Sequence, residues 1–408
     1  MGKPKIRFKG YEDAWEQRKL DSWGTFYYGR SCPKWSVTED ATIPCIRYGE
    51  LYTKFGAKID IVYSYTNMPP ENLRFSKGTE VLIPRVGEDP MDYNHCTWLS
   101  MPDVAIGEMI SVFNTDNNPL FTATMFNATL QNKFAMRVEG GSVTNLYFEK
   151  LKNIEVSFPS IQEQEKIAAY FENLDHLITL HQRKCEETKS LKKYMLQKMF
   201  PENGKCVPEI RFSGFSDAWE QRKLGEIYGS IGNAFVGTAT PYYVEQGHFY
   251  LESNNVKDGQ INHNSEIFIN DEFYEKQKDK WLHTGDVVMV QSGHVGHAAV
   301  IPKELNNTVA HALIMFRNPK EEIEPYFLNY EYQTDKVKKK IENITTGNTI
   351  KHILASDMQE FVVDVPKYEE QKVIASYFSH LDHLITLHQH KCDELQKLKK
   401  FMLQNMFV

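Results

Sequence analysis

The amino-acid sequence predicts an α+β protein: two mixed α/β modules separated by two long antiparallel coiled-coil-like helices, with a pseudo-two-fold internal repeat. Three observations support this prediction. Nearly the whole chain consists of two repeated copies, each copy ends in a long segment of helix-forming residues, and the segments between the repeated ends contain short β-branched runs. At 408 residues the chain is also too long for one typical core.

The closely similar ends of the repeat set the expected domain organisation. Residues 4–20, PKIRFKGYEDAWEQRKL, recur at 208–224 as PEIRFSGFSDAWEQRKL, and we name each of these stretches the opening segment. Residues 159–200 recur at 366–407, with LDHLITLHQ identical in both copies. The expected parts are a first module (1–158), a first long helix with a linker (159–207), a second module (208–365) and a second long helix (366–408).

The segments between these ends look unrelated, yet they keep a common frame. GTEVLIPR at 78–85 lies opposite GDVVMVQS at 285–292, and residues 140–143 lie opposite 347–350 at the same offset. A plain recent duplication would have left these segments as alike as the ends. We therefore infer that the two copies share one structural role and meet different ligands.

The end of each copy predicts one long amphipathic helix. Residues 163–199 contain neither Pro nor Gly, and at 1.5 Å per residue such a helix extends roughly 50 Å. Residues at spacings of three or four form a stripe in each copy: Leu177, His181, Cys185, Thr188, Leu191 and Met195, then Leu384, His388, Cys392, Leu395, Leu398 and Met402. Neither helix can bury its stripe alone, so the two are expected to pair antiparallel, with the modules at opposite ends.

This pairing also predicts where the chain termini lie. If a two-fold axis relates the copies, Phe407 must lie beside Pro4, as Phe200 lies beside Pro208 through the short linker at 201–207.

Each module is expected to hold strands followed by a helix. The β-branched runs at 81–84 and 287–290 are introduced by Gly78 and Gly285. The second module continues with strands at 298–301 and 312–316. A helix is expected over 324–343, ended by Thr346 and Gly347.

Composition excludes several classes of protein. The six cysteines are scattered without a C-x-x-C pair, so neither a disulfide framework nor a cysteine-built zinc site is indicated. No stretch approaches eighteen uninterrupted apolar residues, and the basic N-terminus lacks the apolar run of a signal peptide. These features favour a cytoplasmic location without membrane association.

The sequence offers no recognisable catalytic centre. It contains no phosphate-binding loop, no dinucleotide-binding glycine turn and no nucleophile elbow, so neither catalytic nor metal-binding residues are expected. Residues 67–70, NMPP, are only partly similar to an adenine methyltransferase loop, because Met68 is inserted and Glu71 stands where an aromatic residue belongs. His294 and His297, with His311 downstream, have a spacing found in metal sites, but polar contact or exposure on their glycine-flanked loop is the stronger interpretation.

Charge argues against unaided nucleic-acid binding. The net charge is −7, residues 20–158 carry 12 Lys and Arg against 16 Asp and Glu, and residues 224–365 carry 12 against 20. Because phosphate contacts need positive charge, a DNA-binding chain of this composition requires local basic strips or a basic partner.

Particular loops nevertheless suit base and phosphate contact. Gln and Asn hydrogen-bond adenine, Arg hydrogen-bonds guanine, and lysine strips meet phosphates. The candidate DNA-binding residues are Arg85, Asp92, Asn94, His95 and Ser142 in the first module, and Gln291, Ser292, His294, His297, Lys336, Lys339, Lys340, Asn348, Thr349 and Lys351 in the second. For the lysines, which include Lys338, a solvated helix face is as good an interpretation as phosphate contact.

The combined pattern closely resembles the specificity subunits of type I restriction-modification enzymes. The motif P-x-x-x-E-Q-x-x-I begins each long helix, G-x-[ST]-[VI] precedes it, and AWEQRKL ends each opening segment, with dissimilar segments between them. The match runs from about Lys3 to Phe407. These motifs occur together at the same spacing in both copies, which makes the resemblance to this family highly specific.

The resemblance implies that residues 20–158 and 224–365 are target recognition domains, each of which reads one half of a bipartite asymmetric DNA site. It implies two modification subunits that bind S-adenosylmethionine and methylate adenine, and restriction subunits that translocate and cleave with ATP and Mg²⁺, while this chain has no cofactor of its own. Partner contact is expected at the starts of the long helices, at Gln164, Ile167, Tyr170 and Phe171 and at Gln371, Ile374, Tyr377 and Phe378.

Two alternatives stay open at this point. A subunit of a methylation-only or type IIB-like complex would share these features. A non-DNA scaffold whose helices space two binding modules would also share the repeat.

Overall fold

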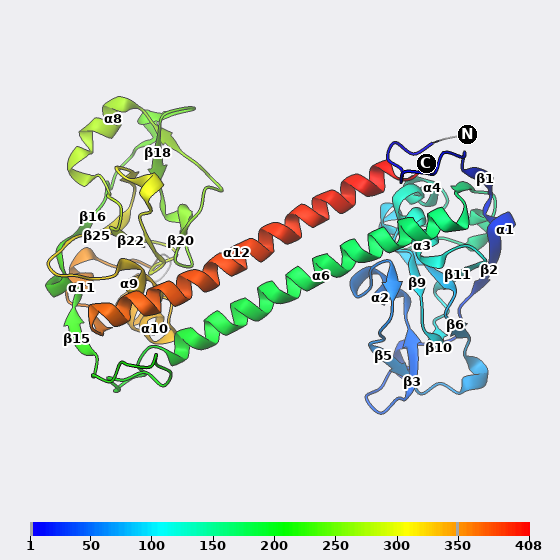
Figure 1. Ribbon diagram of the computed structural model, residues 1–408, viewed down its shortest axis with the longest axis horizontal. Coiled ribbons are helices and arrows are strands. Elements are labelled where there is room, and N and C mark those ends of the chain that lie inside the picture. The colour runs from blue at the N-terminus through cyan, green and yellow to red at the C-terminus, as the bar shows by residue number, and fades with distance from the viewer. Residues whose placement is uncertain (1–2, 348–350) are drawn as a thin grey trace. The chain divides into compact units, whose positions relative to one another are not determined.

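The computed structural model describes residues 3–347 and 351–408, which form two compact units (Figure 1). Unit 1 comprises Met1–Gln182 and His390–Val408, and unit 2 comprises Arg183–Gln389. Two long helices, α6 (Ile161–Lys198) and α12 (Tyr368–Asn405), contribute to both units. Each compact unit contains one module together with half of each long helix. The module boundaries expected from the sequence therefore stay a prediction.

Unit 1 is built on two sheets of mixed strand direction. The first has the order β2-β11-β7-β9-β4, with β4 parallel to β9 and the other pairs antiparallel. The second has the order β5-β3-β10-β6, with β10 parallel to β3. Their strands are β2 (Gly24–Tyr28), β3 (Ile43–Ile46), β4 (Lys58–Ile59), β5 (Ser64–Thr66), β6 (Phe75–Lys77), β7 (Glu80–Pro84), β9 (Thr97–Leu99), β10 (Pro102–Ile106) and β11 (Ile110–Thr115).

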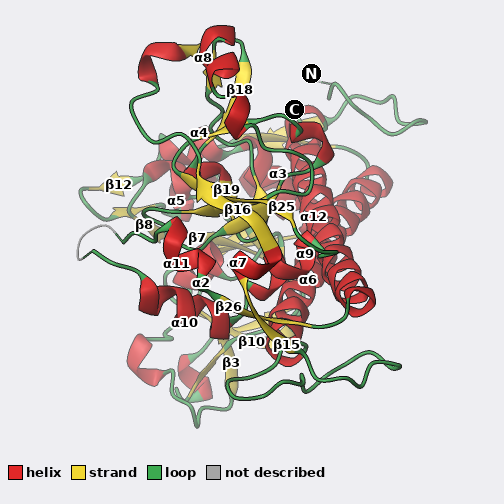
Figure 2. Ribbon diagram, turned by 90° about the vertical axis from the view of Figure 1, so that its left-hand side faces the viewer, coloured by secondary structure: helices red, strands yellow, loops and turns green. Residues whose placement is uncertain are grey.

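Unit 2 has a smaller version of the same plan (Figure 2). One sheet has the order β16-β25-β22-β23 and the other β17-β21-β18-β24. Their strands are β16 (Tyr228–Asn233), β17 (Tyr243–Val244), β18 (His248–Leu251), β21 (Phe268–Ile269), β22 (Val287–Val290), β23 (Ala298–Val300), β24 (Val309–Ala310) and β25 (Leu313–Pro319). The predicted strand runs in both modules are therefore confirmed.

Shorter pairings and helices complete the units. The additional strands are β1 (Glu16–Lys19) with β14 (Glu155–Phe158), β8 (Val86–Gly87), β12 (Glu139–Gly140) with β13 (Thr144–Asn145), β15 (Glu220–Lys223) with β26 (Val362–Val365), and β19 (Val256–Lys257) with β20 (Gln260–Ile261). The shorter helices are α1 (Leu20–Trp23), α2 (Tyr48–Thr53), α3 (Pro119–Thr129), α4 (Gln131–Ala135), α5 (Phe148–Leu151), α7 (Leu224–Ile227), α8 (Asp271–Lys276), α9 (Pro325–Glu331), α10 (Asp335–Ile344) and α11 (Ala355–Gln359).

The central strand of each unit is buried on both faces, which explains its unbroken apolar run. Successive side chains of a strand point to opposite faces. Val81 and Ile83 of β7 therefore join the core around α3 and α6, while Leu82 joins a second core with Val112. In unit 2, Met289 and Val288 of β22 divide between two cores in the same way.

The turn before each central strand requires a left-handed residue. Gly78 has φ +91° and Gly285 has φ +90°, a conformation that glycine adopts without steric cost. In unit 1 the buried carboxylate of Glu80 accepts hydrogen bonds from the backbone N–H groups of Lys77, Gly78 and Thr79 at 2.9–3.0 Å. The glycines identified in the sequence thus set the frame from which each central strand begins.

Within each unit, α6 and α12 run antiparallel and pack together. In unit 1, Ile178 of α6 shares a core with Leu395 of α12, and Lys399 pairs with Asp175 at 2.5 Å. In unit 2, the equivalent pair is Lys192 with Asp382 at 2.6 Å. The predicted long antiparallel helices are confirmed.

The predicted seam stripe is partly wrong. Cys185, Cys392 and Leu395 are buried as expected, but Leu177, Leu191 and Leu398 are 40–45% exposed. Other apolar residues of the helices are buried instead, namely Leu174, Ile178, Leu196 and Leu381. The sequence spacing identifies an apolar face, but the module as well as the partner helix covers that face, which shifts the buried positions.

The two opening segments make the same contacts in their own units. In unit 1, the Ile6 N–H donates to the Asn405 carbonyl at 2.9 Å, and the Trp15 and Phe407 rings lie 6.3 Å apart. In unit 2, Ile210 donates to the Lys198 carbonyl at 2.9 Å, and Trp219 lies 5.8 Å from Phe200. The expected position of Phe407 beside the first opening segment is confirmed by these contacts, and Figure 1 shows the C-terminal end of α12 next to the N-terminal segment.

A buried ion pair fixes each opening segment to the start of a long helix. Arg7 makes two hydrogen bonds to Glu163, at 2.7 and 2.8 Å, and Arg211 makes two to Glu370, both at 2.7 Å. The carboxylate side chains are only 1–2% exposed. Paired donors of a guanidinium match both oxygens of a carboxylate, so each pair fixes orientation as well as contact.

The helix expected over 324–343 is in fact two helices, α9 and α10. The break falls at Tyr332–Thr334, where the Thr334 hydroxyl accepts a hydrogen bond from the Val337 N–H at 3.3 Å. Thr and Asp favour helix starts because their side chains satisfy free backbone N–H groups. The sequence Thr334-Asp335 is therefore a helix start, which the continuous polar pattern concealed.

Candidate nucleic-acid interface

The candidate DNA-reading loops follow the central strand of each unit. Arg85 follows β7 and Gln291 follows β22. In unit 1 the Arg85 carbonyl accepts a hydrogen bond from the Leu146 N–H at 2.8 Å, and in unit 2 the Gln291 carbonyl accepts one from Ile353 at 3.1 Å. The same backbone connection therefore positions two chemically different side chains, and it places Arg85 opposite Gln291, not opposite Ser292 as the sequence frame predicts.

Arg85 lies between aromatic rings. Its guanidinium carbon is 4.9 Å from the centre of the Tyr28 ring and 6.0 Å from that of Tyr147, and its Nη2 contacts the Met109 sulfur at 3.0 Å. Its Nε is buried without a hydrogen-bond partner. The side chain is thus held in place with donor capacity to spare, as a base-reading arginine requires.

The other candidates of the first module surround the same loop. Ser142 is exposed in the turn between β12 and β13, and β13 pairs with β8 directly after Arg85. The imidazole of His95 is paired with Asp92 at 2.9 Å, and Asn94 donates to the Asn127 carbonyl at 3.3 Å. Tyr93 ties this segment to β13 through a 2.6 Å hydrogen bond to the Thr144 carbonyl.

In the second module, Gln291 and Ser292 lie beside the segment that contains Lys351. The Gly293 N–H donates to the Lys351 carbonyl at 3.2 Å, and Ser292 forms a β-bridge with His352. The buried Oε1 of Gln291 has no hydrogen-bond partner. Lys351 is exposed, whereas the candidates Asn348 and Thr349 lie outside the described residues.

The two candidate histidines lie in the loop after these residues. Their rings are 6.3 Å apart, with His294 exposed. The Nδ1 of His297 accepts a hydrogen bond from the Asp258 N–H at 3.2 Å. Desolvation lowers the pKa of His297, which favours the neutral ring that this contact needs.

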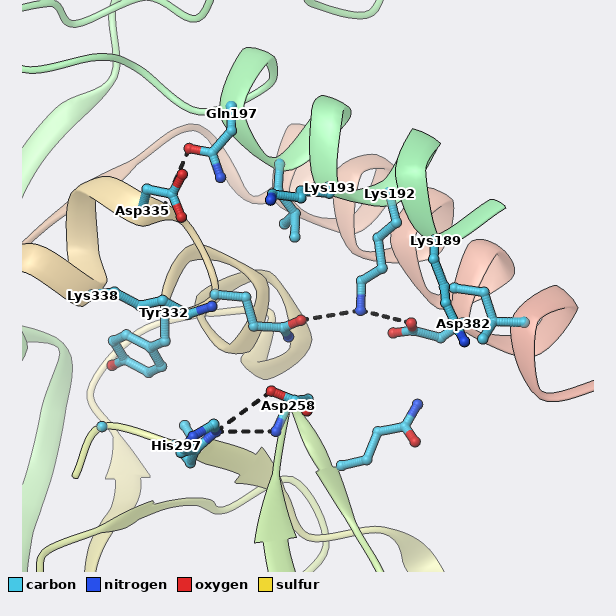
Figure 3. Close-up of a pocket in the computed structure, with 17 residues that line it drawn as sticks. Lys189, Lys192, Lys193, Gln197, Asp258, His297, Tyr332, Asp335, Lys338 and Asp382 are labelled. Carbon is cyan, nitrogen blue, oxygen red and sulfur yellow. Dashed lines mark hydrogen bonds and ion pairs between the residues drawn. The ribbon is translucent and has the colours of Figure 1, made fainter. Parts of the chain in front are cut away.

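His297 also lines a cavity of about 450 Å³ within unit 2 (Figure 3). Four lysines of α6 and α10 line the same cavity, as do three aspartates: Lys189, Lys192, Lys193 and Lys338, with Asp258, Asp335 and Asp382. Lys192 is bonded to both Asp382 and Gln333, at 2.6 and 3.0 Å. The cavity is therefore of mixed charge, and two of its aspartates, Asp382 and Asp258, are paired with Lys192 and His297.

The predicted lysine strip does not form one surface. Lys336 is paired with the buried Asp364, also donates to the Pro201 carbonyl at 2.9 Å, and is only 12% exposed. Lys340 donates to the Val362 carbonyl at 3.4 Å, and Lys339 is exposed. The expectation of a phosphate-facing strip is wrong for Lys336, because its charge is neutralised inside the unit.

Most of the expected partner-binding residues are turned inward. Six of the eight are at most 2% exposed: Gln164, Ile167, Phe171, Gln371, Ile374 and Phe378. The Gln164 Oε1 accepts a hydrogen bond from the Asn118 N–H at 3.0 Å, and Gln371 accepts one from Glu324 at 2.9 Å, so each binds the start of a module helix. These six side chains pack within their own units, and their contact with a partner stays a prediction. Tyr170 and Tyr377 are half-buried, and their contact with a partner stays a prediction.

An exposed apolar pair that was not among the residues predicted from the sequence occurs twice. Leu191 and Tyr194 on α6 are 45% and 53% exposed, and the repeat-equivalent Leu398 and Phe401 on α12 are 41% and 52% exposed. The available signal was a large apolar residue at both positions in both copies. The spacing of apolar residues along the sequence instead predicts that Leu191 and Leu398 face the partner helix.

Among residues 3–347 and 351–408, no group of three or more His, Cys, Asp or Glu side chains could hold a metal ion. No helix in these ranges combines the length and apolar character needed to span a membrane.

Comparisons with known proteins agree on one family. The family described as "Type I restriction modification DNA specificity domain" matches residues 103–190 and 216–397, more than half of the chain. Two relatives come from Methanocaldococcus jannaschii: the putative type I restriction enzyme MjaX specificity subunit, 25% identical over 257 residues, and the type I restriction enzyme MjaVIII specificity subunit, 22% identical over 272 residues. The matches cover 62% and 65% of this chain, and 58% and 64% of the respective relatives, less than two thirds of their lengths.

Solved structures share the fold. The S subunit of a type I restriction-modification system from M. genitalium superposes with a TM-score of 0.65 at 14% identity, covering 100% of this chain and 99% of that one. A chain from a structure describing complex assembly of a type I R-M system gives a TM-score of 0.52 at 15% identity, covering 98% of this chain and 99% of that chain.

The repeated contacts and dissimilar reading loops define a protein that carries two separate recognition modules on one repeated helical frame. This chain belongs to the family of type I restriction-modification DNA specificity domain proteins.

Proposed function

We propose that this chain is the DNA specificity subunit of a type I restriction-modification complex, and that each module reads one half of a bipartite asymmetric target. The observation that carries the proposal is the contrast within the repeat. Phe200 and Phe407 have the same aromatic neighbours in their own units, whereas the equivalent loops present Arg85 in one module and Gln291 in the other. A repeated frame with different reading side chains suits two copies of one partner acting on two different half-sites.

The same proposal assigns catalysis to the partners. Two modification subunits would bind S-adenosylmethionine and methylate one adenine in each half-site, and restriction subunits would supply ATP- and Mg²⁺-dependent translocation and cleavage. This chain would contribute recognition and docking, in the cytoplasm where these partners meet DNA.

The duplicated apolar pair is the docking surface that we assign to the modification subunits. Leu191 with Tyr194, and Leu398 with Phe401, lie three residues apart on a helix, so each pair shares one face. Large exposed apolar side chains at repeat-equivalent positions fit two copies of a single partner.

Binding of the reconstituted complex tests the recognition function. The chain and its modification subunits are purified together and titrated against a duplex that carries their mapped methylation site. Selective binding to this duplex over a scrambled one is expected. Absence of DNA binding would favour a non-DNA scaffold, whereas selective binding and methylation without a restriction subunit would identify a methylation-only complex.

Subunit stoichiometry tests the docking surface. L191A/Y194A and L398A/F401A are each expected to leave a complex with one modification subunit, measured by light scattering after gel filtration. L387A is the matched control, because Leu387 on α12 is 51% exposed but its repeat equivalent, Leu180, is half-buried. Two bound subunits in either double variant would contradict the assignment.

A further inference from the structure

Three arginines of unit 1 converge on the end of strand β2. Arg74 donates to the Tyr28 carbonyl at 2.7 Å, and the Arg85 guanidinium lies over the Tyr28 ring. Arg30 follows Tyr28 by two residues, and its Nη1 donates to the Glu71 carbonyl at 3.3 Å. We name Arg30, Arg74 and Arg85 the arginine cluster.

Backbone hydrogen bonds hold Arg30 and Arg74 on either side of Ile106. The Arg30 N–H donates to the Ile106 carbonyl at 2.8 Å, and the Ile106 N–H donates to the Arg74 carbonyl at 2.9 Å. The chain approaches very closely here, because a Cβ on Gly29 would lie 2.0 Å from the Gly107 carbonyl oxygen. Arg30 and Arg74 are therefore fixed as neighbours by buried β structure, while both side chains stay exposed.

The cluster stands out because its charge is not neutralised. Within the described part of the chain, no carboxylate forms an ion pair with any of its three guanidinium groups, although unit 1 is rich in acidic residues. Most other arginines do have carboxylate partners: Arg7, Arg18, Arg183, Arg211 and Arg222. Glu149, the acidic residue bonded to Tyr28, accepts from the tyrosine hydroxyl at 2.7 Å.

Aromatic rings and carbonyl oxygens restrain the guanidinium groups. Arg74 lies over the Tyr27 ring at 5.0 Å, and Arg85 lies between Tyr28 and Tyr147. The side-chain hydrogen bonds of Arg30 to Glu71 and of Arg74 to Tyr28 each use one nitrogen of the guanidinium, which leaves further donors for a ligand. Guanidinium groups held in this way lose little side-chain entropy when they bind an anion.

Among its described residues, the second module has no equivalent of this cluster. Strand pairing places Tyr28 opposite Ser111 in β11 and Asn233 opposite Ile314 in β25, so Phe235 stands at the position of Arg30. Phe235 is half-buried, and its ring packs on that of Phe273 at 5.0 Å. The lone arginine between residues 224 and 365, Arg317, is bonded to the Asp279 and Trp281 carbonyls.

We propose that two members of the arginine cluster, Arg30 and Arg74, form the phosphate-binding site of the first module, where they attract the DNA backbone to this acidic chain. The inference rests on the proposed DNA-reading function and deepens it. It separates two tasks: Arg30 and Arg74 hold the backbone beside the half-site, while the recessed Arg85 is placed to read a base.

The salt dependence of DNA binding tests this assignment. Each phosphate contact changes the slope of log K against log salt concentration by about 0.9. R30A/R74A, assembled with the modification subunits on a duplex carrying the mapped methylation site, is expected to reduce the slope by about 1.8. Between 50 and 200 mM salt, the wild-type complex should then lose about 12-fold more affinity than the variant.

Matched variants keep the inference falsifiable. R18A removes a guanidinium that also lies over an aromatic ring, Trp23 at 4.9 Å, but that is paired with Glu16, so its slope should equal that of wild type. R30K/R74K keeps the charges and should restore most of the slope, which excludes misfolding as the cause. An unchanged slope in R30A/R74A, or an equal decrease in R18A, overturns the inference. Failure of the wild-type complex to bind DNA would instead overturn the proposed function.

Discussion

The two modules share a frame but differ in the chemistry of their polar side chains. Residues 20–158 contain five arginines and one histidine, whereas residues 224–365 contain one arginine and seven histidines. The surrounding contacts hardly differ, since Arg7 with Glu163 and Arg211 with Glu370 form the same buried pair. The difference teaches that the contacts made by repeated residues maintain the fold, which leaves the loops after β7 and β22 free to differ.

The shared frame predicts equal sensitivity of the two units to loss of an equivalent ring. Phe200 packs on Trp219, Phe327 and Phe378, and Phe407 packs on Trp15, Phe121 and Phe171. F200A and F407A are each expected to cost about 3–5 kcal/mol of unfolding free energy, measured by urea denaturation. F401A, at an exposed ring of the same helix as Phe407, should cost about 0.5 kcal/mol or less. A large cost for only one of the buried rings would break the equivalence.

A buried acid distinguishes the second unit. Phe327 and Phe121 occupy equivalent positions in the two units. Glu331 lies four residues after Phe327 and Met125 lies four residues after Phe121, so Glu331 is equivalent to Met125 of the first unit. Desolvation raises the pKa of the fully buried Glu331 to about 8, from an ordinary value of 4.5. The folded state therefore keeps a proton that the unfolded state releases, and stability falls as pH rises from 4.5 through 8.

E331Q removes this titration. It should stabilise the protein by on the order of a few kcal/mol at pH 8, with little effect at pH 4.5, as followed by urea denaturation across that range. M125Q is the control for introducing an amide into the equivalent site, and it should show no such pH dependence. The prediction fails if E331Q and wild type lose stability in parallel as pH rises.

Substitutions in the reading loops should affect one half-site each. R85A and Q291A are expected to weaken or relax recognition in different halves of the target, at about 1–3 kcal/mol per lost base contact. Binding to duplexes altered in one half at a time measures this. If either substitution changed the preference in both halves, one reader per half would be the wrong description.

The smallest effect is expected from moving the chain ends. Because Asn405 accepts a hydrogen bond from Ile6, the C-terminal helix already contacts the first opening segment. Joining Val408 to Met1 with a short linker and reopening the chain between Pro201 and Val207 should therefore leave assembly and the methylated sites unchanged. Genomic methylation mapping and gel filtration measure both. Loss of assembly would show that the 201–207 connection is needed for the frame.

The long helices and the unit cores could be predicted because their signals are repeated and periodic. Unbroken helix-forming residues and conserved spacing identified α6 and α12, and Gly78 and Gly285 identified the turns before the central strands. The direction in which a helix faces was harder to predict. Gln164 and Gln371 carry a recognisable motif, but only the packed structure shows that they bind the starts of α3 and α9.

The lysine strip shows that predicting the candidate site from sequence was limited in the same way, because the sequence does not show which face of a helix is turned inward. Lys336 and Lys340 are four residues apart and share one face of α10, whereas Lys338 and Lys339 point elsewhere. Val337 and Ile341 are buried next to the first face, so it is turned toward the unit. Counting charges along the sequence could not separate these faces. The arginine cluster was missed for the converse reason, because Arg30, Arg74 and Arg85 are far apart in sequence and meet through the pairing of β2, β6, β7, β10 and β11.

The central claim is that each module reads its own half of the target on a shared frame. Exchange of residues 20–158 for the same segment of another family member tests it most directly, with methylated adenines mapped across a genome that carries the chimera. One half of the target should change while the other half, and complex assembly, stay as in wild type. A change in both halves, or an unchanged target with a correctly assembled complex, would contradict the account.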